Sequence, residues 1–190
     1  MEPVWTREAL QGMTPQELRR LFAQLEAPGI DEMHGEYRAR LLAQGNWLAL
    51  AGDRLVLRNP FRAWLCKAFR PVDADSGRGY NSFRQGGRVV QAYPMLTLVA
   101  PSRFDGRPAY TLVYRQFHSA CAAVHMVDEV RRVAPGLYLG MGTWGFTAAQ
   151  RRLAWPFLLE GPVAPYRGDI GRARHDFQPG PRELPALFAR

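Results

Sequence analysis

Hydrophobic and charged residues alternate over Met33–Leu42. From Met33, every second residue is apolar or small (Met, Gly, Tyr, Ala, Leu), and most of the residues between them are charged. A repeat of two residues is typical of a β-strand with one buried and one exposed face. We therefore expect a strand here, with Tyr37 on its buried face.

A different period precedes this strand. The sequence TPQE, starting at Thr14, has the form of a helix capping box, with Pro15 at the first helical position. Apolar residues follow at the spacing of one helical face, and Pro28-Gly29 ends the pattern. The residues of this apolar stripe are Leu18, Leu21, Phe22 and Leu25.

From residue 33 onward the chain has the pattern of short strands separated by turn residues, with no helix between successive strands. Such a series predicts a mainly β protein, an antiparallel up-and-down barrel of about 8–10 strands. The segment Phe61–Phe69 suits either a helix or a bent strand, and Val72–Arg78 reads as a polar loop. The expected strands are Met33–Leu42, Trp47–Ala51, Leu55–Arg58, Tyr80–Phe83, Val89–Tyr93, Met95–Val99, Ala109–Phe117, His125–Val133, Leu137–Trp144 and Leu153–Leu159.

These patterns divide the chain into three parts. Residues 1–30 form an N-terminal helical segment, residues 31–162 form the barrel, and residues 163–190 form a C-terminal tail rich in proline and glycine. The apolar stripe of the helix suits a position across one mouth of the barrel and equally a position on its outside. Leu184, Leu187 and Phe188 are expected to dock as one terminal turn.

Composition limits the class of protein. The 190 residues are 47% hydrophobic, which is enough for one sizeable core. No apolar run of about 18 residues is present, so no membrane span is expected. The opening residues, MEPVWTREALQG, lack the apolar stretch of a secretory signal peptide, and we expect a cytoplasmic protein. In that compartment Cys66 and Cys121 are expected to be thiols rather than a disulfide.

The chain is basic, with a formal net charge of +8, and Lys67 is the only lysine among 25 basic residues. The arginines are scattered, and no basic tail or helix-turn-helix pattern is present, so a nucleic-acid partner is not expected. An arginine-rich exterior that binds an anionic partner stays as an alternative.

Motifs for metal or cofactor chemistry are missing from the sequence. His34, His118, His125 and His175 form no metal-binding spacing, and the two cysteines are far apart. No phosphate-binding glycine loop opens a helix, and we read the glycines of GLYLGMGTWG as sites of bending or close approach within strands. We expect no metal and no cofactor.

Two charged residues are weak candidates for catalysis. Asp128 and Glu129 are adjacent on an expected strand, so they point to opposite faces, one inward and one to solvent. If Asp128 is the inward residue, it is a possible ligand anchor or general base, and the alternative is an ion pair with Arg38 or Arg131. Lys67 lies in the apolar segment WLCKAF and is the other candidate; the alternative places its ammonium in water.

Several segments together resemble a known group of proteins: MHGEYRARLL, WLCKAF, GYNSF, FDGRPAYTLVYRQF, VDEVRRVAPGLYLGMG and PFLLEGP. They resemble bacterial proteins with a lipocalin-like, calycin-type barrel that are largely uncharacterised and begin with Gly-x-Trp-x-Gly. Gly35-x-Tyr37-x-Ala39 stands in that position here, and the resemblance covers Leu18 to Pro162. It implies a barrel of eight to ten strands and an apolar ligand, and it implies no catalytic residues.

The aromatic residues raise the question of what fills the barrel. A small barrel is either packed with side chains or holds one small ligand. We expect a lumen that binds a small apolar or amphipathic molecule. A packed interior, or an enzyme acting on a hydrophobic molecule in the same lumen, is the alternative. The expected ligand-binding residues are Tyr37, Asn81, Tyr110, Tyr114, Met126, Asp128 and Trp144.

Overall fold

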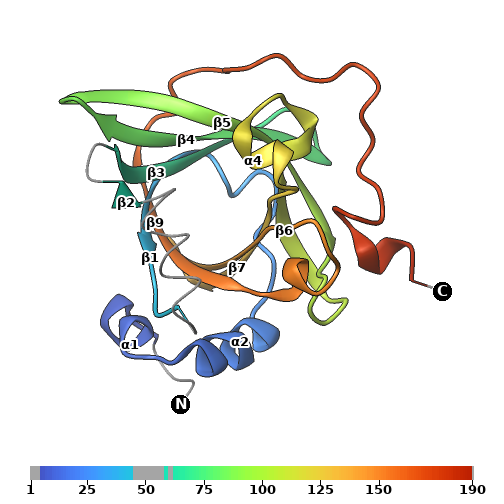
Figure 1. Cartoon of the computed structure of the whole chain (residues 1–190). Helices are drawn as coiled ribbons and strands as arrows, with labels where there is room; N and C mark the ends of the chain where they lie inside the picture. Colours follow the sequence, from blue (N-terminus) through green and yellow to red (C-terminus); the bar gives the residue numbers. More distant parts are fainter. Residues whose placement is uncertain (1–4, 45–57, 60–61, 190) are drawn as a thin grey trace.

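The computed structural model describes residues 5–44, 58–59 and 62–189, and its main feature is a closed β-barrel (Figure 1). Within these residues nine strands form one antiparallel sheet, and pairing of the first strand with the third closes eight of them into a barrel. Each barrel strand neighbours the next along the chain, so the topology is an up-and-down meander. The expected fold class is confirmed. The strands are β1 (Gly35–Leu41), β2 (Arg58–Asn59), β3 (Arg62–Pro71), β4 (Ser76–Gln85), β5 (Arg88–Pro101), β6 (Pro108–Val113), β7 (Val127–Ala134), β8 (Leu137–Thr143) and β9 (Trp155–Ala164).

Alternation along each strand separates the barrel interior from its outside. On β1, Tyr37 contributes to the inner core together with the half-buried Ala39 and Leu41, and charged residues stand between them. On β8 the inward residue Tyr138 alternates with Leu139, which packs on the outer side. The buried inner cluster consists of Ile30, Met33, Tyr37, Phe69, Met95, Tyr110, Leu112, Tyr114, Cys121, Val130, Tyr138, Phe157 and Leu159.

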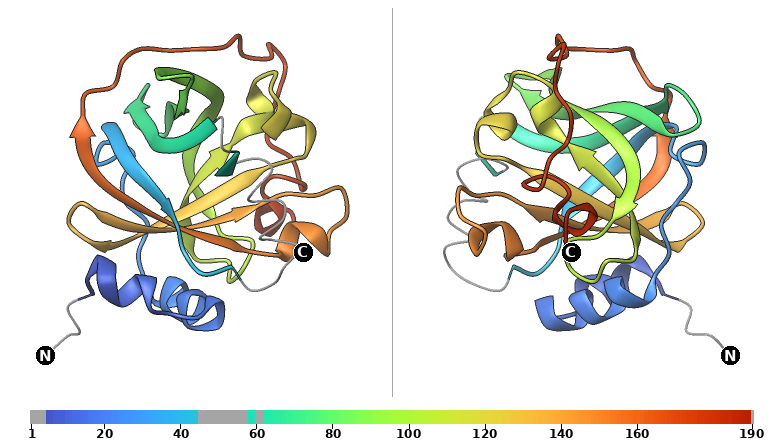
Figure 2. Two further views of the ribbon diagram at one scale, coloured as in Figure 1. Left: turned by 60° about the vertical axis from the view of Figure 1, so that its left-hand side comes forward. Right: turned by 90° about the vertical axis from the view of Figure 1, so that its right-hand side faces the viewer.

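The N-terminal helices α1 (Arg7–Gln11) and α2 (Pro15–Gln24) lie outside the barrel (Figures 1 and 2). The capping box of α2 is present, because the Thr14 side chain accepts from the Glu17 N–H and Glu17 Oε2 accepts from the Thr14 N–H. The apolar stripe of α2 packs on outward residues of β8 and β9, including Leu139 and Leu158. Of the two positions that the stripe allows, the helix therefore takes the one on the outside of the barrel. The helix α1 was not expected from the sequence.

Local backbone geometry changes several strand boundaries. The ambiguous segment Phe61–Phe69 is a strand from Arg62 onward, as part of β3, and not a helix. Val89–Tyr93 and Met95–Val99 are one long strand, β5, which passes through Tyr93 with a φ of 54°. β4 begins at Ser76, inside the segment that we expected to be a loop. The expected strands at Trp47–Ala51 and Leu55–Arg58 lie outside the described residues, except that Arg58 begins β2.

A short helical turn replaces the end of one expected strand, and another expected strand begins two residues later than predicted. β6 stops at Val113, and Tyr114–Gln116 form the 3-10 helix η1. The helix α4 (Ala120–Ala123) follows, and His125, with a φ of 54°, leads into β7. The remaining 3-10 helices are η2 (Gln150–Arg152) and η3 (Pro185–Leu187). A turn is present at the expected place, but of the three residues expected to dock only Leu184 is buried, and Leu187 and Phe188 are exposed.

The C-terminal residues after β9 run along the outside of the barrel (Figure 2). Ion pairs attach this tail to the barrel: Asp169 lies 2.6 Å from Arg70 and 3.1 Å from Arg78, and Arg167 lies 3.0 Å from the buried Glu36. Among the described helices, none has the length and apolar character needed to cross a membrane.

Candidate functional site

Three strands and one 3-10 turn place polar side chains close together inside the barrel. Lys67 on β3 is the register partner of Asn81 on β4. Asp128 on β7 pairs with Leu112 on β6, and Tyr114 lies two residues further along the chain, where β6 gives way to η1. Because side chains two residues apart on a strand share a face, these residues converge in the lumen from different parts of the sequence. We call Lys67, Asn81, Tyr114 and Asp128 the polar cluster.

The polar cluster is closely connected. The Lys67 ammonium lies 2.7 Å from Asp128 Oδ2 and donates hydrogen bonds to Tyr114 Oη (2.6 Å) and Asn81 Oδ1 (3.1 Å). The Tyr114 hydroxyl donates to Asp128 Oδ2 at 2.8 Å and accepts from Asn81 Nδ2 at 3.3 Å. The side chains of Lys67 and Asp128 are 3% and 4% exposed. Burial of two opposite charges is tolerated because each is paired with the other and with polar neighbours.

Aromatic rings surround the buried ammonium. Lys67 Nζ lies 5.2 Å from the ring centres of Trp64 and Phe157 and 5.3 Å from that of Tyr114. At these distances the ring faces of Trp64 and Phe157 attract a cation, whereas Tyr114 meets the ammonium through its hydroxyl. The Trp64 indole N–H also donates to Asn81 Oδ1 at 3.0 Å, which fixes the amide that receives the Lys67 hydrogen bond. Lys67 is thus held by the protein in one position.

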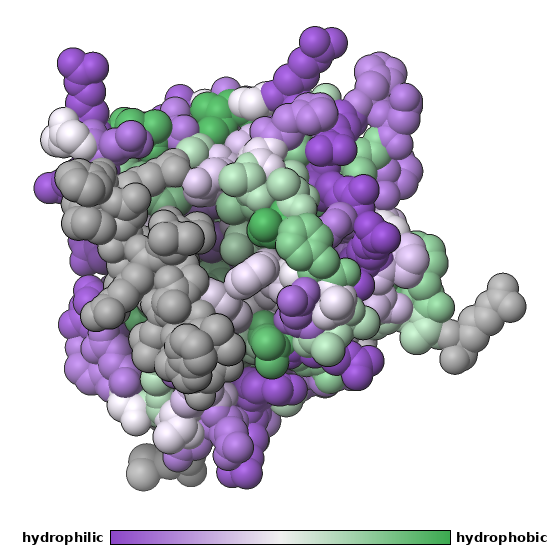
Figure 3. Space-filling model, viewed as in Figure 1, coloured by the Kyte–Doolittle hydropathy of each residue, from purple (hydrophilic) through white to green (hydrophobic). Residues whose placement is uncertain are grey.

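A cavity of about 40 Å³ lies beside the polar cluster. A single water molecule needs roughly 10–15 Å³ by the same measure, and a cavity of about 150 Å³ holds a benzene molecule. As it stands the cavity therefore admits a few water molecules, and a ligand with an aromatic ring enters only if the lining side chains move apart. Figure 3 is drawn from the same side as Figure 1, and it shows hydrophobic residues near the centre of this face. The cavity walls are almost wholly apolar apart from the polar cluster. The other lining residues are Leu41, Trp64, Phe83, Tyr93, Cys121, Met126, Gly142, Trp144, Trp155 and Phe157.

The two carboxylate oxygens of Asp128 have different surroundings. Oδ2 forms the ion pair with Lys67 and accepts the hydrogen bond from Tyr114, whereas Oδ1 is directed toward Gly142 on β8. A side-chain Cβ at position 142 would lie 3.1 Å from Oδ1. Because residue 142 is glycine, no side chain from β8 stands against Oδ1, and Gly142 itself lines the cavity. The cavity therefore combines apolar walls with a lining that includes Asp128 and its polar partners.

The hydrogen bonds of the cluster occupy the amine of Lys67. The Lys67 ammonium is already engaged by a carboxylate, a phenol and an amide. Burial, reinforced by the Asp128 carboxylate, raises the pKa of Tyr114 well above its usual value, so its hydroxyl keeps its proton. Within the described residues, no group of three or more His, Cys, Asp or Glu side chains is placed to hold a metal ion.

The structure separates the expected ligand-binding residues into two groups. Asn81, Tyr114, Met126, Asp128 and Trp144 all line the cavity. Tyr37 and Tyr110 also point into the barrel but are packed in its core away from the cavity. The Tyr37 hydroxyl donates to the Glu32 carbonyl, and the Tyr110 hydroxyl donates to Thr97.

For Asp128 and Lys67 the structure rejects the alternatives, and for Glu129 it corrects the expectation. Asp128 faces inward and pairs with Lys67, not with Arg38 or Arg131. The Lys67 ammonium is buried rather than in water. Glu129, expected in solvent, is also buried.

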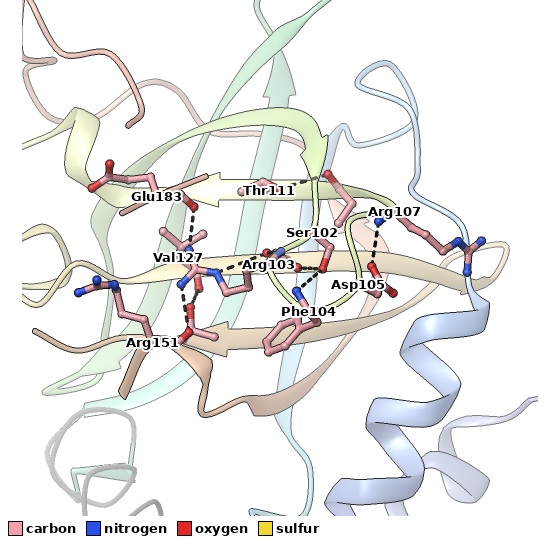
Figure 4. A network of polar contacts seen from close by, with 12 residues as sticks. Ser102, Arg103, Phe104, Asp105, Arg107, Thr111, Val127, Arg151 and Glu183 are labelled. Atoms are coloured by element: carbon pink, nitrogen blue, oxygen red, sulfur yellow. Dashed lines mark hydrogen bonds and ion pairs between the residues drawn. The ribbon is translucent and has the colours of Figure 1, made fainter. Parts of the chain in front are cut away.

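The Glu129 carboxylate accepts from the Ser102 hydroxyl and from the Arg103 N–H (2.8 Å) under the loop that follows β5. Figure 4 shows Ser102 and Arg103 of this loop. Burial raises the pKa of this carboxyl despite these donors.

Sequence reasoning did not assign Gly142, Cys121, Trp155 or Phe157 to the site. Gly142, Trp155 and Phe157 stand on faces that alternation alone could have indicated, since Gly142 is two residues from Trp144 and Trp155 is two residues from Phe157. Cys121 gave no such signal, because it belongs to the short helix α4.

An eight-stranded up-and-down barrel with a buried polar cluster in its lumen is thus the class that fold and site define. No protein-family model and no curated protein matches the chain. Among solved structures, the chain is similar to the crystal structure of a protein from Thermomonospora curvata, with a TM-score of 0.48 and 17% identity over 78% of this chain and 87% of that one.

Proposed function

We propose that the protein binds a small amphipathic molecule in the barrel lumen, as in lipocalin-like barrels. The ligand places its apolar body against the aromatic walls and donates a hydrogen bond from a hydroxyl or amine to Oδ1 of Asp128. The observation that carries the proposal is the apolar cavity whose lining includes all four residues of the polar cluster, Asp128 among them.

Burial and hydrogen bonding both favour such a ligand. Apolar surface gains about 25 cal/mol for each Å² removed from water. A hydrogen bond to a charged acceptor contributes about 1.5–3 kcal/mol. The polar cluster is held in place before binding, because Lys67 and Tyr114 already fix Oδ2 of Asp128. The ligand therefore meets a preorganised acceptor rather than a flexible side chain.

Phenol and toluene are a suitable pair of probes, because they have nearly the same shape and only phenol donates a hydrogen bond. We expect phenol to bind with one site per chain and to bind at least about tenfold more tightly than toluene. Isothermal titration calorimetry measures both affinities. Equal affinities would contradict the proposed role of Asp128, and no binding of either probe would contradict a ligand-binding lumen.

Gly142→Ala tests whether the preference for phenol depends on Oδ1 of Asp128. Its new methyl group stands 3.1 Å from Oδ1 of Asp128 and blocks the approach of a donor, so the advantage of phenol over toluene should disappear. Gly12→Ala is the control, because a Cβ there makes only ordinary contacts of 3.6 and 3.8 Å at the end of α1, and both affinities should be unchanged.

A further inference from the structure

A second concave site lies on the outside of the barrel and differs from the polar cluster in its chemistry. Its volume is about 290 Å³. Three segments form it: the loop between β5 and β6, the residues around η2, and the C-terminal residues around η3. We call it the arginine groove. The residues that line it are Ser102, Arg103, Phe104, Asp105, Gly106, Ala148, Arg151, Arg152, Pro181, Arg182, Pro185, Ala186 and Ala189.

A buried arginine holds the walls of the groove together (Figure 4). The Arg103 side chain is 2% exposed. It donates from Nη1 to the Arg151 carbonyl at 3.2 Å and from Nη2 to the Glu183 carbonyl at 2.8 Å. These carbonyls are next in sequence to Arg152 and Arg182. One buried guanidinium therefore fixes the backbone from which both exposed arginines project.

The positive charge of the groove is not balanced by its acidic residues. Asp105 is neutralised from outside the groove by Arg131, with two hydrogen bonds of 2.7 Å. The Glu183 carboxylate faces Arg115 at 3.5 Å. Among the described residues, Arg152 and Arg182 form no ion pair and no side-chain hydrogen bond. Both are exposed, so their guanidinium groups are available to a ligand.

From this arrangement we propose that the arginine groove binds a small molecule carrying a phosphate group. A guanidinium presents a planar set of N–H donors that matches the oxygens of phosphate, and two such groups on a fixed backbone suit a multiply charged anion. Three short segments bound the groove, and its volume of about 290 Å³ favours a compact anion over the length of a nucleic-acid strand.

Pyrophosphate is the probe, and isothermal titration calorimetry at constant chloride concentration is the measurement. We expect one saturable site per chain. The double variant Arg152→Gln/Arg182→Gln should weaken binding by at least about tenfold, because two charge-assisted contacts are lost.

The matched control is Arg84→Gln/Arg88→Gln, which removes the same charge from exposed residues of the β4–β5 hairpin, on the opposite side of the molecule in Figure 1. Its affinity should stay within about twofold of the wild type. All four residues are exposed, so both variants should keep the wild-type circular dichroism spectrum.

Three results would overturn the proposal. The first is no saturable binding of pyrophosphate to the wild-type chain. The second is an equal loss of affinity in both double variants, which would indicate a response to net charge. The third is tighter, groove-dependent binding of a single-stranded oligonucleotide than of pyrophosphate, which would assign the arginines to nucleic acid.

Discussion

Replacing Lys67 with methionine is expected to lower the free energy of unfolding by about 3–5 kcal/mol, because the buried Asp128 carboxylate then loses its cationic partner. Tyr114 continues to donate to the remaining charge. The change is measured by urea unfolding at neutral pH. Asp128→Asn is expected to cost less than Lys67→Met, because the ammonium keeps its hydrogen bonds to Asn81 and Tyr114 and its three aromatic neighbours.

The double variant Lys67→Met/Asp128→Asn tests the pair directly. It removes both buried charges together, and the new amide oxygen at position 128 still accepts from the Tyr114 hydroxyl. The double variant should therefore be more stable than Lys67→Met alone, with a coupling energy of at least about 2 kcal/mol. A double variant whose loss equals the sum of the two single losses would contradict a direct interaction between the two residues.

Arg131→Met is the second substitution expected to lower stability strongly. Arg131 lies on β7, as Asp128 does, but on the outer face of the strand. The Arg131 side chain is fully buried and pairs with Asp105 through two hydrogen bonds of 2.7 Å. It also donates to the carbonyls of Phe22, Arg107 and Pro108, at 2.7, 3.0 and 3.0 Å, and its guanidinium lies 4.5 Å from the Phe22 ring centre. We expect a loss of about 3–5 kcal/mol, measured by urea unfolding, together with faster proteolysis within α2.

For Arg131 the control is a second substitution at its acidic partner, and here we expect little recovery of stability. Adding Asp105→Asn to Arg131→Met should recover little stability, because the three backbone carbonyls remain without their donor. A loss below about 1 kcal/mol in Arg131→Met would show that these contacts do not attach α2 to the barrel.

The barrel could be predicted from the sequence because apolar and polar residues alternate along its strands. The two faces of β1 are distinct, with apolar Tyr37 and Leu41 against charged Glu36 and Arg38. Turn residues mark most of the strand ends. One wrong boundary lies at Tyr93, where a positive φ coincides with a shift in the β4–β5 register and β5 continues as one strand.

The candidate site was only partly predictable, because alternation gives the face of a residue and not its depth in the barrel. Tyr110 and Tyr114 stand on the same face of one segment, yet Tyr114 contacts Lys67 and Tyr110 packs against Phe69 in the core. Depth depends on strand register, which pairs Asp128 with Leu112 and Val130 with Tyr110. No local pattern specifies this register.

The sequence also did not indicate which outer-face residues are covered by segments distant along the chain. Glu129 stands on the outer face of β7, where alternation predicts solvent. The loop that contains Ser102 and Arg103 covers it, and the C-terminal segment at Glu183 is held over that loop. The partnership of Lys67 and Asp128 was hidden for a similar reason. They belong to β3 and β7, which are not neighbours in the sheet, and only the curvature of the sheet into a barrel brings them together.

A crystal structure of the protein grown with phenol tests the central claim most directly. We expect electron density for one phenol in the cavity bounded by Trp64, Trp144 and Phe157, with its oxygen about 2.5–3.0 Å from Oδ1 of Asp128. A lumen without phenol at a saturating concentration, or a phenol whose oxygen points away from Asp128, would contradict the account.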